Sequence, residues 1–250
     1  VRPTAGSATV LGMDAQRESL AVRRRTGVLP EGYHVYDRLT GRQHVQFVVQ
    51  SKSVDDDPAA VLDRVGIADA AERKAGGYSK GMKQRLALGM ALVGDPDLLI
   101  LDEPSSGLDP TGAREIREIV REESREGTTV FFSSHVLSQV EAVCDRVGIL
   151  RAGELVAVDS VEGLREAAGT QATLSITVDA VTDGAVEAVE ALSGVSRVSV
   201  DDTRLTVSLD DGAKTAVLDA IESAGAEVLD FETEESSLED LFISYTEGAQ

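Results

Sequence analysis

Apolar positions along residues 1–160 follow two different periods. Some form short runs bounded by polar or Gly residues, which is typical of strands: 6–11, 26–29, 98–102 and 128–133. Others recur every three or four residues and predict helices: about 41–52, 57–66, 82–93, 111–126 and 136–145. Further strands are expected near 147–158. Because strands alternate with helices, we expect an α/β domain built on a parallel sheet.

The pattern changes after Gly169. "TLSITV", "VSRVSV" and "RLTVSL" alternate apolar and polar residues, whereas "DGAVEAVEAL" and "AKTAVLDAIESAG" have helical spacing and "EVLDF" reads as a strand. The resulting order, β-α-β-β-α-β, predicts an α+β ferredoxin-like domain within residues 170–250. Ser236 and Glu239 then have the spacing of a capping box. They predict a terminal docking helix with an apolar face formed by Leu238, Leu241, Phe242 and Tyr245.

The distribution of charge divides the chain at nearly the same place as the hydrophobic pattern. The formal net charge is −20. Residues 1–153 hold 20 basic and 22 acidic side chains, whereas residues 154–250 hold 4 and 22, a net charge of −18. Such an acidic segment disfavours contact with nucleic acid or an anionic membrane. Aromatic residues make up 4% and Trp is absent, which removes the stacking surface of a single-strand nucleic-acid binder.

The single cysteine and the first residues of the chain give information about the cellular compartment of the protein. Cys144 excludes an internal disulfide, fits a reducing cytoplasm, and lies in a helical pattern where a small buried apolar side chain is expected. No uncharged stretch is long enough to span a bilayer, and no signal peptide opens the chain. The first residue is Val rather than Met, so we expect further residues upstream.

The stretch "LLILDEPSSGLDP" (98–110) brings the first candidate chemistry. Aliphatic residues of a buried strand run directly into Asp102 and Glu103. Two carboxylates at the carboxyl end of a strand suit a Mg²⁺ ion and an activated water, as phosphoryl transfer requires. Taken alone, the same string also fits a strand that leads into a solvated turn.

The stretch "GGYSKGMKQRL" (76–86) offers a place for an anion. Ser79 carries a hydroxyl that can donate a hydrogen bond, and Gly81 lets the backbone approach a ligand closely. A helix expected to start near Met82 directs its unpaired N–H groups and positive dipole end the same way. Taken alone, this string would be an ordinary Gly-rich turn.

Together these strings resemble the motifs of ATP-binding cassette (ABC) ATPases, in the family's order and spacing. Tyr78–Met82 resembles the signature loop, and 98–102 with Glu103 resembles the Walker B strand and the catalytic glutamate. The acidic tail and the "YSKGMKQRL" variant are similar to cytoplasmic ATPases that serve type-2 ABC export permeases. The remaining matches are 105–109 with the D-loop, His135 with the switch histidine, and 28–43 with the Q-loop and the start of the helical subdomain.

The resemblance implies a nucleotide-binding face. Lys80 and Met82 replace the Gly and Gln that are usual in the signature loop. Lys80 would either add a cation near the triphosphate or point to water. The residues that would meet ATP across a dimer interface, or form part of that interface, are Ser79, Lys80, Gly81, Met82, Gly107 and Asp109.

The resemblance also implies catalytic and metal-binding groups. Asp102 would hold Mg²⁺ through water, and Glu103 would orient and deprotonate the attacking water. His135 would contact the γ-phosphate or Glu103. Glu31 stands where the Q-loop has Gln, and its carboxylate can still reach Mg²⁺ while adding a negative charge beside the phosphates.

One part of the family's site has no counterpart in these residues. The Walker A loop, G-x-x-x-x-G-K-[ST] between a strand and a helix, holds the β- and γ-phosphates. The nearest string, "GGYSKGMK", has Met where the motif needs Lys. In the family this loop lies upstream of the segment that resembles "RPTAGSATVLG". We therefore expect an N-terminally truncated ABC domain over 1–160 that is inactive alone.

The resulting hypothesis is an ATP-hydrolysing subunit of an ABC export system. It would pair with a second ABC ATPase subunit, with a homodimer favoured, at the cytoplasmic face of the cell membrane. Its helical subdomain (about 32–93) would meet an integral-membrane permease. Two alternatives stay open: a regulatory or decoy subunit that contributes only a signature face, and a soluble ABC ATPase acting on DNA or ribosomes. The latter class usually has inserted coiled coils or a duplicated cassette, and neither occurs here.

Overall fold

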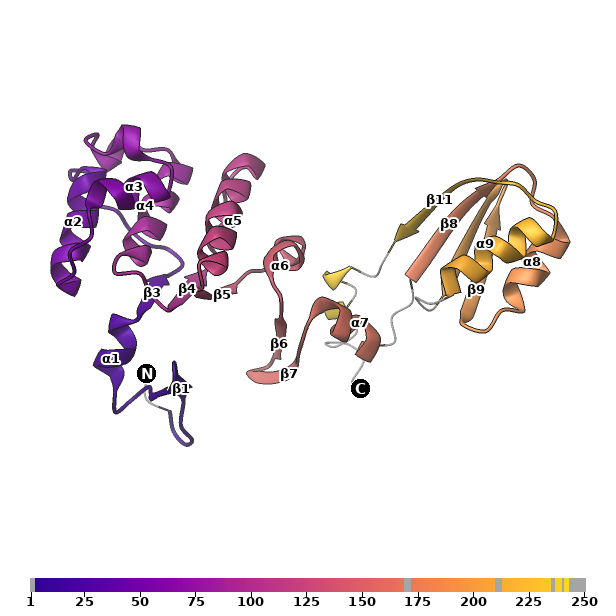
Figure 1. Cartoon of the computed structure of the whole chain (residues 1–250), viewed down its shortest axis with the longest axis horizontal. Coiled ribbons are helices and arrows are strands. Elements are labelled where there is room, and N and C mark those ends of the chain that lie inside the picture. Colours follow the sequence, from indigo (N-terminus) through magenta and orange to yellow (C-terminus); the bar gives the residue numbers. More distant parts are fainter. Residues whose placement is uncertain (1–2, 169–171, 210–212, 235–236, 240, 243–250) are drawn as a thin grey trace. The chain divides into compact units, whose positions relative to one another are not determined.

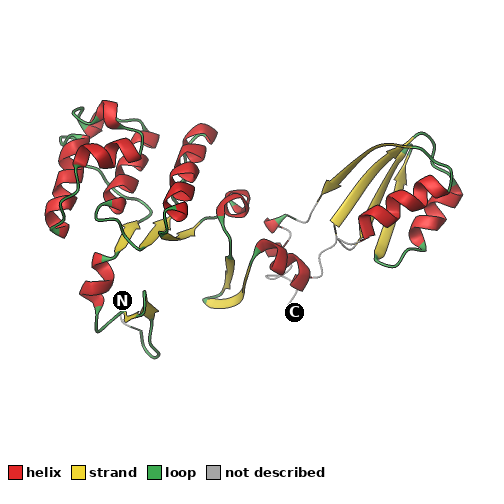
Figure 2. Cartoon of the chain, in the orientation of Figure 1, coloured by secondary structure: helices red, strands yellow, loops and turns green. Residues whose placement is uncertain are grey.

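The computed structural model describes residues 3–168, 172–209, 213–234, 237–239, 241 and 242, and it divides into two compact units (Figure 1). The first unit is Val1–His135 and the second is Val136–Gln250. Each unit mixes helices with strands (Figure 2). No helix among the residues described is long and apolar enough to cross a bilayer. The domain limits expected from the sequence, 1–160 and 170–250, stay predictions.

A three-stranded parallel sheet forms the framework of the first unit. Its middle strand, β4, has a partner on each side, and the buried side chains of Leu99 and Leu101 confirm the apolar strand expected there. On β3, a Cβ added to Gly27 would lie 2.2 Å from the carbonyl oxygen of Ala91, so only glycine lets the helix behind the strand pack this closely. The strands, in spatial order, are β3 (Thr26–Leu29), β4 (Leu98–Asp102) and β5 (Thr129–Ser133).

Helices between β3 and β4 make up the helical part of this unit. Each α-helix there begins after a residue whose side chain accepts a hydrogen bond from a backbone N–H in the first turn, namely Thr40, Asp57 and Ser79. The helices bury aliphatic side chains, which confirms the helical periodicity of the sequence. They are α2 (Gly41–Lys52), α3 (Pro58–Arg64) and α4 (Lys80–Leu92), with short 3-10 turns at Ala68–Ala70 and Ala75–Gly77.

The N-terminal segment differs from the prediction. The strand expected over 6–11 is limited to β1 (Thr9–Val10), because Leu11 and Gly12 adopt positive φ angles of 51° and 78° and turn the chain into β2 (Met13–Asp14). Helix α1 (Ser19–Arg24) was not expected at all. It buries none of its residues, so no apolar periodicity marks it in the sequence.

After β4 and a short turn, α5 (Pro110–Arg125) leads to β5, as predicted. The second unit then opens with α6 (Leu137–Val143), which is shorter than the predicted 136–145 because Cys144 adopts an extended conformation. The strands expected near 147–158 form an antiparallel hairpin, and a further helix was not expected. These elements are β6 (Val147–Arg151), β7 (Glu154–Asp159) and α7 (Val161–Ala168).

The rest of the second unit is a ferredoxin-like α+β domain, as its element order predicted. The four strands form one antiparallel sheet in the order β11-β8-β10-β9, with α8 and α9 against one face (Figure 1). Its core contains the fully buried side chains of Ile176, Val207 and Val217. The elements are β8 (Ala172–Val178), α8 (Asp183–Glu190), β9 (Val195–Asp201), β10 (Arg204–Leu209), α9 (Lys214–Ser223) and β11 (Val228–Glu234).

Most of the predicted terminal helix, including Ser236 and Tyr245, lies outside the described residues. Within them, Leu238 and Leu241 are buried, which agrees with an apolar face, while Phe242 is exposed. The docking role of this segment stays a prediction.

A buried ion pair connects α3 to α5 in the first unit. Arg64 donates two hydrogen bonds to Glu123, from Nε to Oε1 at 2.6 Å and from Nη2 to Oε2 at 2.5 Å. Arg64 also donates from Nη1 to Asp95 at 2.7 Å. The Glu123 side chain is only 1% exposed, so burial raises the pKa of its carboxyl, and the bonds from Arg64 oppose this rise. A buried carboxylate of this kind depends on its partner.

Replacing Arg64 alone by Met should lower the free energy of unfolding by about 3 kcal/mol, because Glu123 would be left buried without its counterion. The double variant Arg64→Met, Glu123→Leu should recover most of this loss, since apolar side chains can replace a buried pair. A raised folded-state pKa favours the protonated carboxyl, so the loss in the single variant should be smaller at pH 5 than at pH 8. Urea unfolding measures both effects. A single variant as stable as the parent would contradict the pair's importance.

Candidate functional site

The carboxyl ends of β4 and β5 bring polar side chains together. Asp102 ends β4 directly opposite Ser133, which ends β5. The Ser133 hydroxyl donates a hydrogen bond to Oδ1 of Asp102 and so orients the carboxylate. Ser133 was missed in the sequence. The available signal was its place as a serine at the end of a predicted strand next to the strand of Asp102.

Glu103 and His135, both predicted as catalytic, lie in direct contact. Oε2 of Glu103 is 2.8 Å from Nδ1 of His135, and Oε1 accepts a hydrogen bond from the backbone N–H of His135 at 2.9 Å. The Glu103 side chain is 16% exposed and that of His135 is 71% exposed. The carboxylate is therefore held in one orientation, while the imidazole remains open to a ligand.

The backbone of Glu103 is strained. Its φ angle is +49°, in the left-handed region that residues with a Cβ disfavour. Its N–H donates to the carbonyl oxygen of Ser133 at 3.1 Å, which helps to hold the conformation. Strain of this kind persists where the surrounding structure enforces it, and it clusters at sites that carry chemistry.

Ser79 is the N-cap of α4, and its hydroxyl oxygen accepts a hydrogen bond from the N–H of Met82 at 3.2 Å. The helix therefore starts at Lys80, two residues before the start expected near Met82, because the serine side chain closes the first turn. The N–H groups of Lys80 and Gly81 precede the first helical hydrogen bonds and are open to an acceptor.

Lys80 connects the signature-like loop to the D-loop-like turn. A Cβ added to Gly107 would lie 2.0 Å from Nζ of Lys80, so the ammonium group rests directly on the glycine. Gly107 also has a φ angle of +64°, which a larger residue would resist. The structure thus brings together two predicted nucleotide-binding residues that are far apart in the sequence.

Asp109 and Glu31 are placed differently from the other candidates. Asp109 is the N-cap of α5 and accepts a hydrogen bond from the N–H of Gly112 at 3.1 Å, so its carboxylate already shapes the turn. Glu31 is exposed in the loop after β3. Its side chain makes no hydrogen bond or ion pair with any described residue, and nothing in the described geometry joins it to Asp102.

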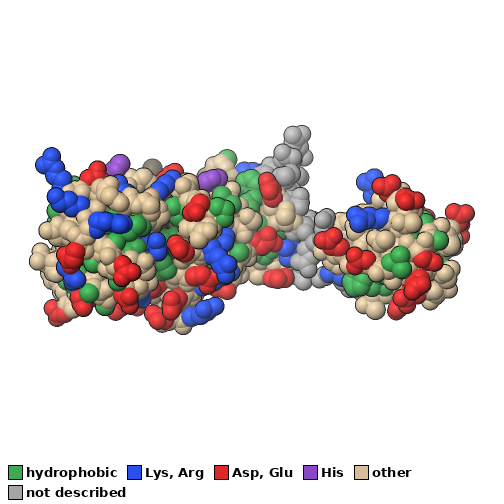
Figure 3. Space-filling model, turned by 90° about the horizontal axis from the view of Figure 1, so that it is seen from above, with side chains coloured by type: hydrophobic (Ala, Val, Ile, Leu, Met, Phe, Trp, Pro, Cys, Tyr) green, Lys and Arg blue, Asp and Glu red, His purple; other side chains and the backbone are tan. Residues whose placement is uncertain are grey.

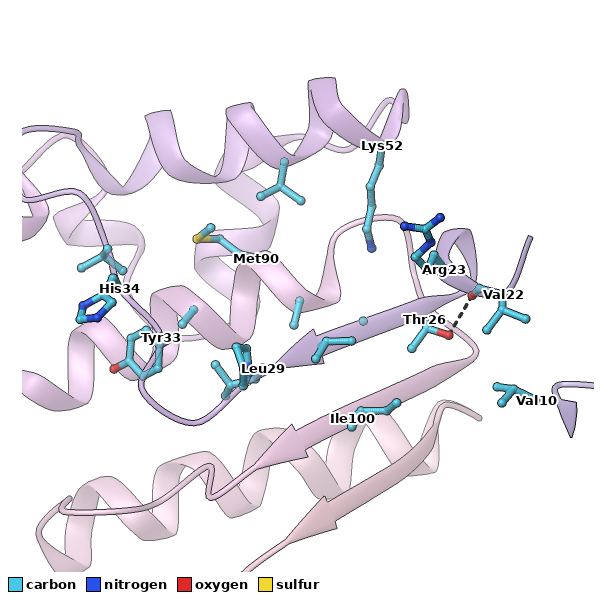
Figure 4. Close-up of a pocket in the computed structure, with 17 residues that line it drawn as sticks. Val10, Val22, Arg23, Thr26, Leu29, Tyr33, His34, Lys52, Met90 and Ile100 are labelled. Carbon is cyan, nitrogen blue, oxygen red and sulfur yellow. Dashed lines mark hydrogen bonds between the residues drawn. The ribbon is translucent and has the colours of Figure 1, made fainter. Parts of the chain in front are cut away.

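A cavity of about 590 Å³ lies elsewhere in the first unit, along β3 (Figure 4). Its walls are mainly aliphatic, with Leu29, Met90 and Ile100 among them, and Arg23 and Lys52 reach it from the side. Nζ of Lys52 donates to the carbonyl oxygen of Val93, so this cation is already bonded. None of the candidate site residues lines the cavity, so it is separate from the chemistry at the end of β4.

Two further residues with reactive types of side chain, His44 and Cys144, are explained by their local environment. His44 is buried, with Nε2 accepting from the N–H of Tyr36 and Nδ1 2.8 Å from the carbonyl oxygen of Thr40. Burial, with a smaller effect of Asp145, raises the pKa of the Cys144 thiol to about 11, which suppresses the reactive thiolate. Neither residue belongs to the candidate site.

The carboxylate of Asp102 at the end of β4 suits a Mg²⁺ ion that is also bound by waters and by the phosphates of a nucleotide. No cluster of three or more His, Cys, Asp or Glu side chains suited to a metal occurs among the residues that the structure describes. Mg²⁺ does not need one when it is bound through waters and substrate phosphates with one or two carboxylates. Asp102, oriented by Ser133, is the residue that would hold it.

Comparison with known proteins agrees with this geometry. Residues 1–106 match the ABC transporter family model, and residues 160–246 match that of the ATP-binding protein DrrA1-3-like C-terminal domain. The daunorubicin resistance ATP-binding protein DrrA3 of Streptomyces coeruleorubidus is 31% identical over 98% of this chain and 80% of its own length. The linearmycin resistance ATP-binding protein LnrL of Bacillus subtilis is 29% identical over 96% of this chain and 80% of its own length.

A solved ATP-binding subunit of an ABC transporter superposes with a TM-score of 0.59, at 26% identity, over 67% of this chain and 72% of that one. The α/β fold of the first unit is therefore that of an ATP-binding domain. The chain belongs to the family of ABC transporter ATP-binding proteins, and its C-terminal domain is of the DrrA-like type.

The left-handed backbone at Glu103 should reverse the usual order of two substitutions. Glu103→Gly and Glu103→Ala both remove the carboxylate, but only glycine relieves the strain, so it should be more stable by about 1 kcal/mol. The matched control is Glu122, exposed on α5, where Gly should be less stable than Ala by about 1 kcal/mol. Urea unfolding of the four variants decides. Alanine as stable as glycine at position 103 would contradict the strained backbone.

Proposed function

We propose that this chain is the ATP-hydrolysing subunit of an ABC export system, with Glu103 as the general base. The observation that carries the proposal is the contact of Glu103 with His135 beside Asp102 at the end of β4. A carboxylate oriented by a ring nitrogen and a backbone N–H can accept the proton of a water that attacks the γ-phosphate. His135 would keep Glu103 in place and offer its exposed ring to the phosphate.

Asp102 would bind Mg²⁺ through water, with the Ser133 hydroxyl fixing the carboxylate. Bound Mg²⁺ would neutralise negative charge on the phosphates. Glu31 is a weaker candidate for this role, because no hydrogen bond or ion pair with a described residue orients its carboxylate. We retain it only as a group that can reach the metal when nucleotide is bound.

The start of α4 would recognise the γ-phosphate of ATP held by a second ABC ATPase subunit. The N–H groups of Lys80 and Gly81 and the positive end of the 13-residue helix favour an anion there. Because the Ser79 oxygen accepts from Met82, its hydroxyl proton remains available to a phosphate oxygen. Lys80, resting on Gly107, would place a cation between the signature loop and the D-loop.

Hydrolysis also needs a Walker A loop. The 250 residues contain no such sequence. The proposed activity therefore depends on a Walker A loop outside these residues, in the same polypeptide or in a partner. A regulatory or decoy subunit is the second candidate, and it would present the same start of α4 to nucleotide held by a partner.

The proposed partners are an identical ATPase subunit and an integral-membrane permease at the cytoplasmic face of the cell membrane. The relatives LnrL and DrrA3 are described as resistance ATP-binding proteins, which supports the export of a toxic compound. The helical part formed by α2, α3 and α4 would meet the permease. The permease rather than this chain would select the transported substrate.

In an assembly that contains a Walker A loop, Glu103→Gln should lower ATP turnover by about 10²–10⁴-fold, because the general base is lost while the side-chain shape is kept. ATP binding should remain, and an ATP-bound dimer should accumulate. Phosphate release and nucleotide binding are measured in parallel. The control is Glu122→Gln on the surface of α5, which should leave turnover unchanged. Near-normal turnover in the Glu103 variant would refute its assignment.

Residues 1–250 alone should neither bind MgATP with micromolar affinity nor release phosphate. The exposed helix start contributes only about 0.3–1 kcal/mol toward an anion, and Asp102, Glu103 and Asp109 add negative charge to the region. Calorimetric titration with MgATP tests this on residues 1–250 and on the same chain fused to a strand, Walker A loop and helix. Restored turnover in the fusion supports the enzyme over the decoy. Tight binding by residues 1–250 would reveal another phosphate site.

A further inference from the structure

Strand β9 forms an unpaired edge of the ferredoxin-like sheet. In the part of the chain that the structure describes, the order β11-β8-β10-β9 gives β9 one strand partner, β10. An open edge presents backbone N–H and C=O groups to which another strand can add. Val200 lies opposite the buried Leu205 and so belongs to the helix-covered face, yet it is 46% exposed. Among the described strands none pairs with the outer side of β9, and this edge also carries an incompletely covered apolar side chain.

The sequence of β9 is complementary to itself in one antiparallel register. When Ser199 lies opposite Ser199 of a second copy, Val198 falls opposite Val200 and Arg197 falls opposite Asp201, on both sides of the two-fold axis. Apolar and opposite-charge cross-strand pairs of this kind stabilise sheets. A register centred on Val198 would instead place Val195 opposite Asp201. The side chains thus select the first register.

The charges needed for this pairing are available. Neither Arg197 nor Asp201 forms an ion pair within the described chain, although Arg204 lies opposite Asp201 on β10. Arg197 and Arg204 are two of the only four basic residues in 154–250. The visible face of the domain otherwise carries mainly acidic charged groups (Figure 3). Because Asp201 and Asp202 balance these two arginines, residues 195–209 are neutral within an acidic domain.

The opposite edge, β11, is unsuited to the same pairing. Asp230 and Glu232 project from one face of this strand, and its register against β8 shifts between Val228 and Asp230. Like charges that face each other across such an edge discourage its pairing with a second copy, whereas the two charges of β9 have opposite signs. The register of β9 against β10 also shifts, but outside Arg197–Asp201. Contact between β9 of one copy and β11 of another would also extend without limit, whereas contact of β9 with β9 closes as a two-fold dimer.

We propose that two copies of this chain pair through β9, so that their four-stranded sheets join into one sheet across the two C-terminal domains. The occupant of the edge is a second copy, because the complementarity is of the strand with itself. The inference rests on the proposed function in one respect, that the ATPase acts as a homodimer. The net charge of −18 in residues 154–250 opposes the contact at low ionic strength.

A charge exchange tests the register directly. In about 0.3 M salt, where the screening length is below about 10 Å, the full chain should self-associate in sedimentation experiments. Arg197→Asp and Asp201→Arg should each weaken this association about tenfold or more, because both symmetric pairs become repulsive. An equimolar mixture of the two variants should restore a 1:1 dimer, since opposite charges then face each other at both positions. A mixture that stays monomeric would overturn the proposal.

Disulfide trapping provides an independent measurement on the full chain. In a Cys144→Ser background, Ser199→Cys should give an intermolecular disulfide under mild oxidation, because the two residues meet at the axis. Thr206→Cys, on the inner strand β10, and Asp230→Cys, on the β11 edge, are the matched controls and should remain monomeric. No disulfide at position 199, or equal trapping at position 230, would refute pairing through β9.

The same variants separate this inference from the proposed function. Loss of β9 pairing with ATP turnover intact in a Walker A-containing assembly would remove the inference and keep the ATPase. A β9 dimer whose Glu103→Gln variant still hydrolyses ATP would keep the inference and remove the proposed role of Glu103.

Discussion

The parallel register of β4 against β5 is the constraint on which the site depends. It sets Asp102 opposite Ser133, so the segments that follow the two strands leave the sheet at the same edge. Glu103 meets His135 there, although 32 residues separate them along the chain. The register in turn depends on the burial of Leu99 and Leu101, because a slip of one residue would turn these side chains to the other face.

Among the candidate site residues that have a Cβ, only Glu103, the proposed general base, has a positive φ angle. Glu103 adopts a left-handed backbone that a glycine would accept more readily. Hydrogen bonds from its N–H to Ser133, and from His135 to its carboxylate, hold the strained conformation. Ser79 and Gly107, in contrast, suit their backbone positions as a helix cap and a left-handed turn residue. Other residues with a Cβ, such as Leu11 and Ser53, also adopt positive φ angles, but none of them is a candidate site residue.

The two units use charge differently. The first is nearly neutral in sum and contains a buried pair, Arg64 with Glu123, that joins two of its helices. The second is strongly acidic, and the core of its four-stranded sheet is formed by alternating apolar residues. Two copies of this acidic domain repel each other, so the few basic residues matter most for the proposed contact between them. Arg197 and Arg204 both lie at or beside the β9 edge.

The sequence by itself determined most elements and the ABC family, because periodicity, helix caps and motif order are local properties. It predicted the three parallel strands, the main helices and the ferredoxin-like order. It missed α1, which buries no side chain, and it extended the first strand through the turn at Leu11 and Gly12. Only the tertiary structure decided which distant groups meet: Ser133 with Asp102, Lys80 with Gly107, and Arg64 with Glu123. Such contacts depend on sheet register and helix packing, which no short stretch of sequence contains.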